Sequence, residues 1–132
     1  MTCFWDGIMR SLDNNDKKLL ELENKNSIYS LIECLKKKNK KVENVLWQNS
    51  ELSNRQKNEN KEHIRLYDKN TAKGGYLCST CDPFLILLCN LLEKDIHHDY
   101  LGNKISYKCK NSKNGTYSYK SNRGHFWFSN KN

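Results

Sequence analysis

The chain has 132 residues, enough for one domain with a single hydrophobic core, and we expect one domain spanning residues 1–132. Hydrophobic residues make up 36% of the chain and gather in blocks between turn signals, which excludes a disordered, collagen-like or linker-like protein. The 23 lysines and arginines outnumber 15 acidic residues and give a net charge of +8. Such a charge predicts either a solvated basic surface or attraction of nucleic acid by non-specific charge.

The sequence contains no run of about 18 apolar residues, so it predicts no transmembrane helix and no membrane partner. A basic segment followed by an apolar one is missing from the N-terminus, so no secretory signal is expected. The six cysteines then indicate reduced thiols in a cytoplasmic protein.

The first part of the chain predicts two amphipathic helices. Apolar residues recur at helical spacing directly after Cys3, and the polar cluster at 13–16 is expected to end this helix. A second helical stripe covers 28–35 and follows Ser27, a residue type that caps helix N-termini.

The middle of the chain predicts a surface helix, a loop and a buried helix. The polar segment 50–67 has few apolar positions, and Ser50 is its expected cap. A loop over 71–80 surrounds Gly74-Gly75, where the lack of side chains permits unusual backbone conformations. Asp82, followed by a proline, is the expected N-cap of an almost wholly apolar helix, which we interpret as the central helix of the core.

From residue 95 onward the apolar period changes to two, which predicts strands. Gly102-Asn103 and Asn114-Gly115 each predict a hairpin turn, and a further turn is expected at 121–124. The fold class is therefore α+β, with three to four helices packed on a small C-terminal antiparallel sheet.

Cys3 and His125 are the sharpest candidates for chemistry. A thiol attacks as a thiolate, which the dipoles of a helix N-terminus stabilise, and an imidazole can hold the thiol proton. The two residues lie at opposite ends of the chain, so they meet only in a fold that brings these ends together. By spacing alone, a lone cysteine is more often a small core residue, and His125 is equally compatible with an ordinary strand position.

Three local patterns resemble the ovarian-tumour (OTU) family of cysteine peptidases. The segment 2–8 is similar to the family's nucleophile helix, in which the cysteine precedes an apolar residue and an aromatic one. Gly74-Gly75 ahead of a helix and Gly124-His125-Phe126 near the end follow in the family's order. The chain is most similar to small OTU-like proteins of large DNA viruses, in the runs His63-Ile64, Gly75-Tyr76, Cys78-Ser79-Thr80, Asp82-Pro83-Phe84-Leu85 and Gly124-His125-Phe126.

The resemblance implies a papain-like OTU domain with Cys3 as nucleophile and His125 as general base and then acid. Its expected activity is cleavage after the Gly-Gly tail of ubiquitin or a ubiquitin-like modifier, without a cofactor. Gly74, Gly75 and Trp127 are the residues it places against the substrate. A viral protein of this kind would act in the host cytoplasm or in the virion.

Two positions depart from the family pattern. Only Met1 and Thr2 precede Cys3, where the family has an Asp-Gly-Asn type loop that helps to form the oxyanion hole. Trp127 stands where relatives carry Asp or Asn, and an indole cannot accept the Nδ1–H bond of the imidazole. Asn130 or a backbone carbonyl is the candidate substitute.

These departures keep two alternatives open. One is a catalytically silent OTU-like fold that serves as a structural or interaction protein, with viral structural proteins as partners. The other is a small basic protein associated with nucleic acid.

Cys78-x-x-Cys81 has the spacing of half a zinc site, but neither Cys109 nor the histidines at 97 and 98 complete a known second pair. We therefore expect no metal. The same two histidines are neighbours in a predicted strand, so one is expected on each face.

Overall fold

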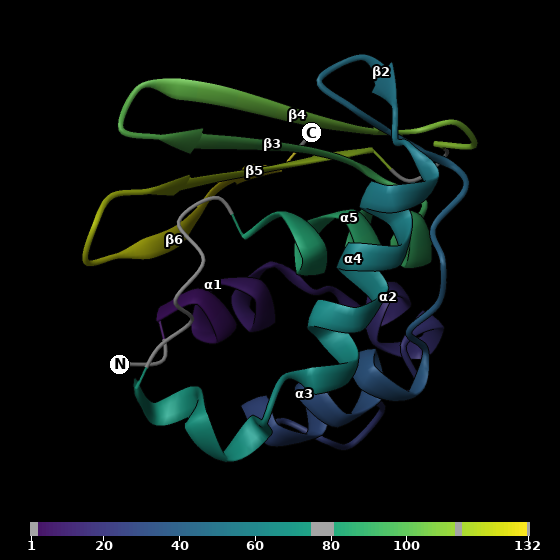
Figure 1. The fold of residues 1–132 in the computed structure, drawn as a ribbon. Coiled ribbons are helices and arrows are strands. Elements are labelled where there is room, and N and C mark those ends of the chain that lie inside the picture. The colour runs from purple at the N-terminus through teal and green to yellow at the C-terminus, as the bar shows by residue number, and fades with distance from the viewer. Residues whose placement is uncertain (1–2, 75–80, 113–114, 132) are drawn as a thin grey trace.

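The structure is a computed structural model, and it describes residues 3–74, 81–112 and 115–131. The helices are α1 (Cys3–Ser11), α2 (Asn14–Leu19), α3 (Ile28–Lys37), α4 (Asn54–Leu66) and α5 (Asp82–Leu92), with a 3-10 helix η1 (Lys69–Gly74). The strands are β1 (Val45–Trp47), β2 (Ser50–Glu51), β3 (Asp95–Tyr100), β4 (Asn103–Cys109), β5 (Thr116–Ser121) and β6 (Phe126–Lys131). The helices gather on one side of the sheet, which confirms the α+β class (Figure 1).

The N-termini of α2 and α3 are both stabilised by capping side chains. Ser27 caps α3 as predicted, and its hydroxyl accepts from the N–H of Ser30. α1 ends at Ser11, directly before the polar cluster, as predicted. The same cluster also begins α2, because Asp13 and Asp16 form a capping box, and this second helix was not predicted.

Two other predicted caps are displaced. Ser53 caps α4 through a capping box with Gln56, whereas Ser50 belongs to β2. Cys81, with a left-handed backbone (φ 60°), is the N-cap of α5, and Asp82 is the first helical residue. The Asp82 carboxylate accepts a hydrogen bond from the Tyr107 hydroxyl instead of capping the helix.

The sheet is mixed and has the order β2-β1-β4-β3-β5-β6. β3 pairs antiparallel with β4 and parallel with β5, so the predicted purely antiparallel C-terminal sheet was wrong. After β4 the chain crosses to the other side of β3 and enters β5, which does not pair with β4. Gly115 therefore lies in a connection between unpaired strands and not in the hairpin turn that was predicted. Asn114 lies outside the described residues. Alternation of apolar residues determines which face is buried, but it does not determine the neighbouring strand.

The β3–β4 hairpin turns one residue earlier than predicted. Tyr100 pairs with Asn103, so Leu101 and Gly102 form the two-residue loop, and both have positive φ (51° and 87°). This is the combination that a type I′ turn requires. The Asp99 carboxylate accepts the N–H of Gly102 and supports the turn.

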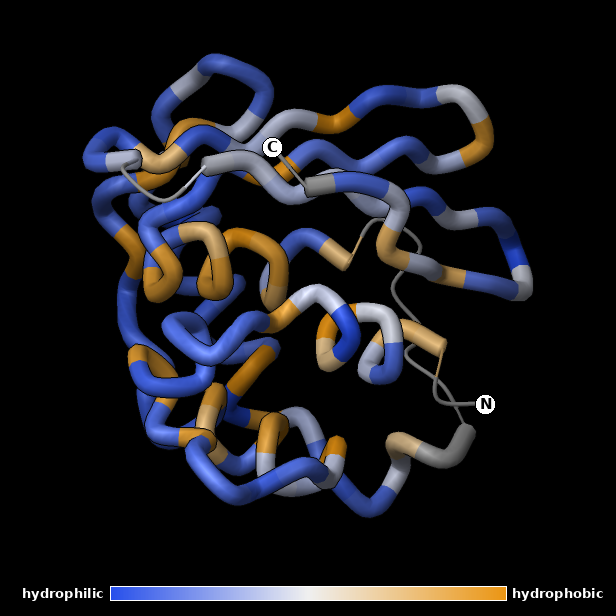
Figure 2. Tube along the Cα trace, turned by 180° about the vertical axis from the view of Figure 1, so that it is seen from behind, coloured by the Kyte–Doolittle hydropathy of each residue, from blue (hydrophilic) through white to orange (hydrophobic). Residues whose placement is uncertain are grey.

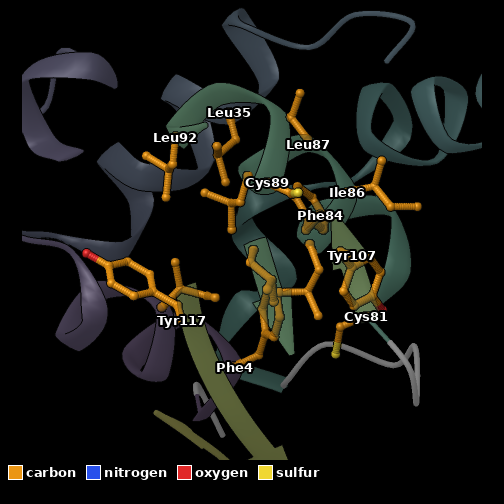
Figure 3. Close-up of a cluster of buried hydrophobic side chains, with 14 of the residues drawn as sticks. Phe4, Leu35, Cys81, Phe84, Ile86, Leu87, Cys89, Leu92, Tyr107 and Tyr117 are labelled. Atoms are coloured by element: carbon orange, nitrogen blue, oxygen red, sulfur yellow. The ribbon is translucent and has the colours of Figure 1, made fainter. Parts of the chain in front are cut away.

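The core lies between the sheet and the outer helices, with α5 at its centre. Phe84 and Leu87 of α5 are fully buried, and Figure 3 shows Phe4, Leu35 and Tyr107 from three other elements gathered around this helix. Burial on all sides explains why α5 is apolar around its whole circumference. In the part of the chain that the structure describes, no helix has the length and apolar character to cross a bilayer.

One ion pair, between Lys94 and Asp16, is held inside this core. Lys94 and Asp16 are almost completely buried, and the Lys94 Nζ lies 2.6 Å from the Asp16 Oδ1. The Tyr117 hydroxyl donates to the Asp16 Oδ2 (2.5 Å) and accepts from the Lys94 Nζ (2.5 Å). The same ammonium stands 3.9 Å from the Tyr117 ring centroid. This network joins α2, the α5–β3 connection and β5.

Candidate active site

Aromatic packing brings the two ends of the described chain together. α1 packs against β6, and the Phe4 and Phe126 rings meet edge to face with centroids 4.8 Å apart. Gly7 lets the helix approach closely, because a Cβ at this position would lie 2.8 Å from the Phe126 ring. Cys3 and His125 directly precede these two phenylalanines, so this contact places them side by side.

The Cys3 Sγ lies 3.5 Å from the Nδ1 of His125, although the two residues are 122 positions apart in the sequence. Cys3 is half-buried at the first residue of α1, and His125 is exposed just before β6. This distance is within hydrogen-bonding range for sulfur, so a proton can pass between thiol and imidazole. The N–H of Cys3 lies in the first turn of α1, where N–H groups have no intrahelical acceptor.

The turn predicted at 121–124 is present, and it holds the backbone of His125. The Asn122 Oδ1 accepts from the N–H groups of Gly124 (2.9 Å) and His125 (2.8 Å). The Asn122 N–H in turn donates to the His125 carbonyl at 2.9 Å. The sequence analysis placed Asn122 in a turn but did not assign its side chain this role, although Asn side chains often accept N–H groups two residues further on.

A second histidine lies beneath the site. His98 is buried, with its Nε2 2.6 Å from the Ser121 Oγ and its ring centroid 5.4 Å from that of Phe126. Its neighbour His97 is exposed, so the expectation of one histidine on each face is confirmed. His98 thus packs under the strand start that carries His125.

The orienting third residue expected after the histidine is not found among the described residues. Because Nδ1 faces the thiol, such a residue would have to accept from Nε2, not from Nδ1 as the sequence analysis assumed. Asn130 pairs with Ser118 in β6, five residues from His125, or about 15 Å at the usual strand rise. Trp127 is 41% exposed and lies opposite Lys120. The structure therefore does not bring Asn130 to the imidazole.

Several predicted residues lie at or beyond the limits of the description. Gly74 ends η1, whereas Gly75 and Cys78 lie outside the described residues. Cys81 is buried at the start of α5. Within the described ranges no group of three or more His, Cys, Asp or Glu side chains is placed to hold a metal ion.

Three other cysteines differ from Cys3 in their surroundings. Burial raises the pKa of Cys34, Cys89 and Cys109, so these thiols stay protonated at neutral pH. Cys34 also donates to the Leu20 carbonyl. Cys3 is thus distinguished from these three by an imidazole neighbour.

No protein-family model, curated protein or solved structure matches this chain.

Proposed function

We propose that the protein is a cysteine peptidase of the OTU type, a viral deubiquitinase that works with a Cys3–His125 dyad. The observation that carries this proposal is the 3.5 Å separation between the Cys3 Sγ and the His125 Nδ1 at the start of a helix. Nucleophile and base within hydrogen-bond reach are the signature of activated thiols.

In this mechanism the imidazole removes the Cys3 proton, and the Sγ attacks the carbonyl carbon of the scissile amide. The N–H of Cys3 donates a hydrogen bond to the resulting oxyanion. The imidazolium then protonates the leaving amine, which departs as the C–N bond breaks and leaves a thioester. His125 next removes a proton from water, and the hydroxide releases the acid product and restores the thiol.

The substrate class comes from the sequence resemblance. It indicates ubiquitin or a ubiquitin-like modifier, cleaved at an isopeptide or peptide bond after the Gly-Gly tail. Gly74, Gly75 and Trp127 are the proposed substrate contacts, and the proposed location is the host cytoplasm or the virion.

The test is covalent labelling with ubiquitin that carries a C-terminal electrophile. Wild type should form an adduct that Cys3→Ala abolishes and Cys34→Ala leaves intact, because Cys34 is a comparably half-buried thiol without an imidazole neighbour. His125→Ala should slow labelling by about 10²- to 10⁴-fold, the usual contribution of a positioned base. Circular dichroism spectra of all variants serve as the folding control.

A second candidate function is a catalytically silent OTU-like fold with a structural or interaction role, for instance with viral structural proteins. It is favoured by the finding that, among the described residues, only Cys3 contacts the His125 ring through a hydrogen bond. If neither the ubiquitin probe nor iodoacetamide reacts with Cys3 faster than with Cys34, this candidate replaces the peptidase. Iodoacetamide reactivity without ubiquitin labelling would instead point to another modifier.

A further inference from the structure

The helices cover one face of the sheet (Figure 1). The strand register places a row of residues across four strands on the opposite face. Asp99 of β3 pairs with Lys104 of β4 on one side and with Lys120 of β5 on the other. Lys120 pairs in turn with Trp127 of β6. The two lysines and the tryptophan are exposed, so they form one continuous surface.

A hollow of about 430 Å³ lies beside this row. Its polar lining includes His97 of β3, Ser118 of β5 and Ser129 of β6. Lys104 and Lys120 also border it. Viewed from behind, the strands are largely hydrophilic, whereas the hydrophobic parts of the trace are concentrated beneath the sheet (Figure 2).

The charges of this face favour an anionic partner. Lys104, Lys108 and Lys120 are exposed, and within the described part of the chain none of them forms an ion pair. The acidic groups here already accept backbone hydrogen bonds: Asp99 from the N–H of Gly102 and Asp95 from that of Cys109. The three ammonium groups therefore remain available to a ligand.

We propose that this outer face of the sheet binds single-stranded nucleic acid. Unpaired bases can stack on the exposed indole of Trp127, while Lys104 and Lys120 contact phosphates on either side of the hollow. The Ser118 hydroxyl and the His97 imidazole on its floor can bond to sugar and phosphate oxygens. A duplex hides the faces of its bases, so the exposed aromatic ring favours a single strand.

The experiment measures fluorescence anisotropy of a labelled oligo-dT of about 20 nucleotides as salt is raised from about 50 mM. Lys104→Glu/Lys120→Glu should weaken binding more than tenfold and reduce the salt slope by about 1.4, since each neutralised phosphate contributes roughly 0.7. The matched control is Lys37→Glu/Lys61→Glu, which changes the charge equally at exposed positions of α3 and α4. This control should leave the binding near the wild-type value.

Trp127 provides an independent readout. Trp5 is fully buried and Trp47 is half-buried, so quenching of tryptophan fluorescence by the oligonucleotide should come mainly from Trp127 and disappear in Trp127→Leu. The same variant should bind about fivefold or more weakly, the usual loss of one stacking platform. Equal weakening by both lysine pairs, or no binding by wild type at low salt, would overturn the proposal. Tighter binding to a duplex of the same length would do so as well.

Discussion

Removing the ammonium of Lys94 measures how much the buried ion pair with Asp16 contributes to the free energy of unfolding. Lys94→Met leaves the Asp16 carboxylate buried with the Tyr117 hydroxyl as a remaining donor. Breaking a buried ion pair from one side costs about 3–5 kcal/mol, and the retained tyrosine bond places this case near 3 kcal/mol. A domain of this size has a total stability of roughly 5–15 kcal/mol, so the variant loses a large fraction of it.

The assay is urea unfolding of wild type, Lys94→Met and Asp16→Leu/Lys94→Met, followed by circular dichroism. The double variant should recover part of the loss, because it leaves no buried carboxylate without a partner. Asp13, which also lies 3.7 Å from the Lys94 Nζ, is 38% exposed and stays in contact with water, whereas the capping box of α2 loses the Asp16 side chain. Lys110→Met is the control: it removes a lysine that pairs with Glu51 on the surface, and exposed pairs contribute little.

Unfolding of Lys94→Met at the same urea concentration as Lys110→Met would show that the buried pair contributes no more than a surface pair. A double variant as unstable as the single one would show that the loss reflects packing and not an uncompensated carboxylate.

Three further predictions concern the site and the core. Gly7→Ala places a methyl group against the ring of Phe126 and should slow ubiquitin-probe labelling by up to about a hundredfold. Gly124→Ala should label normally, because its added Cβ meets only the Asn122 Oδ1 at an ordinary contact distance of 4.0 Å; equal rates would contradict the role of the Gly7 contact. Iodoacetamide at neutral pH should alkylate Cys3 before the three cysteines whose pKa burial raises, and peptide mapping by mass spectrometry would expose the opposite order. Burial raises the pKa of Tyr117 and Tyr119 above the value of about 10 that they have in the unfolded chain. The neutral phenols therefore stabilise the fold fully below about pH 10, and this stabilisation is lost as the pH rises above that value. Urea unfolding at about pH 9 and pH 11 checks this, and unchanged stability at the higher pH would show that the two phenols ionise without cost.

Helix positions and the face that each element buries follow from short stretches of sequence. The stripe after Cys3, the cap at Ser27 and the apolar run behind Asp82 predicted three of the helices, because propensity, capping and periodicity act over one or two turns. Cys3 and His125 were also selected from local sequence: Cys3 by its place at a helix start, and both by the resemblance of the residues around them to OTU peptidases.

Strand order and the geometry of the dyad depend on contacts between distant residues. β3 presents the same alternating pattern to an antiparallel and a parallel neighbour, and it has one of each. α5 contacts β3 and β4, and α1 contacts β6 at the edge of the sheet, so the arrangement of the strands depends on residues throughout the chain. For the same reason no local pattern showed that Gly7 admits Phe126, the contact that sets the sulfur of Cys3 beside the Nδ1 of His125.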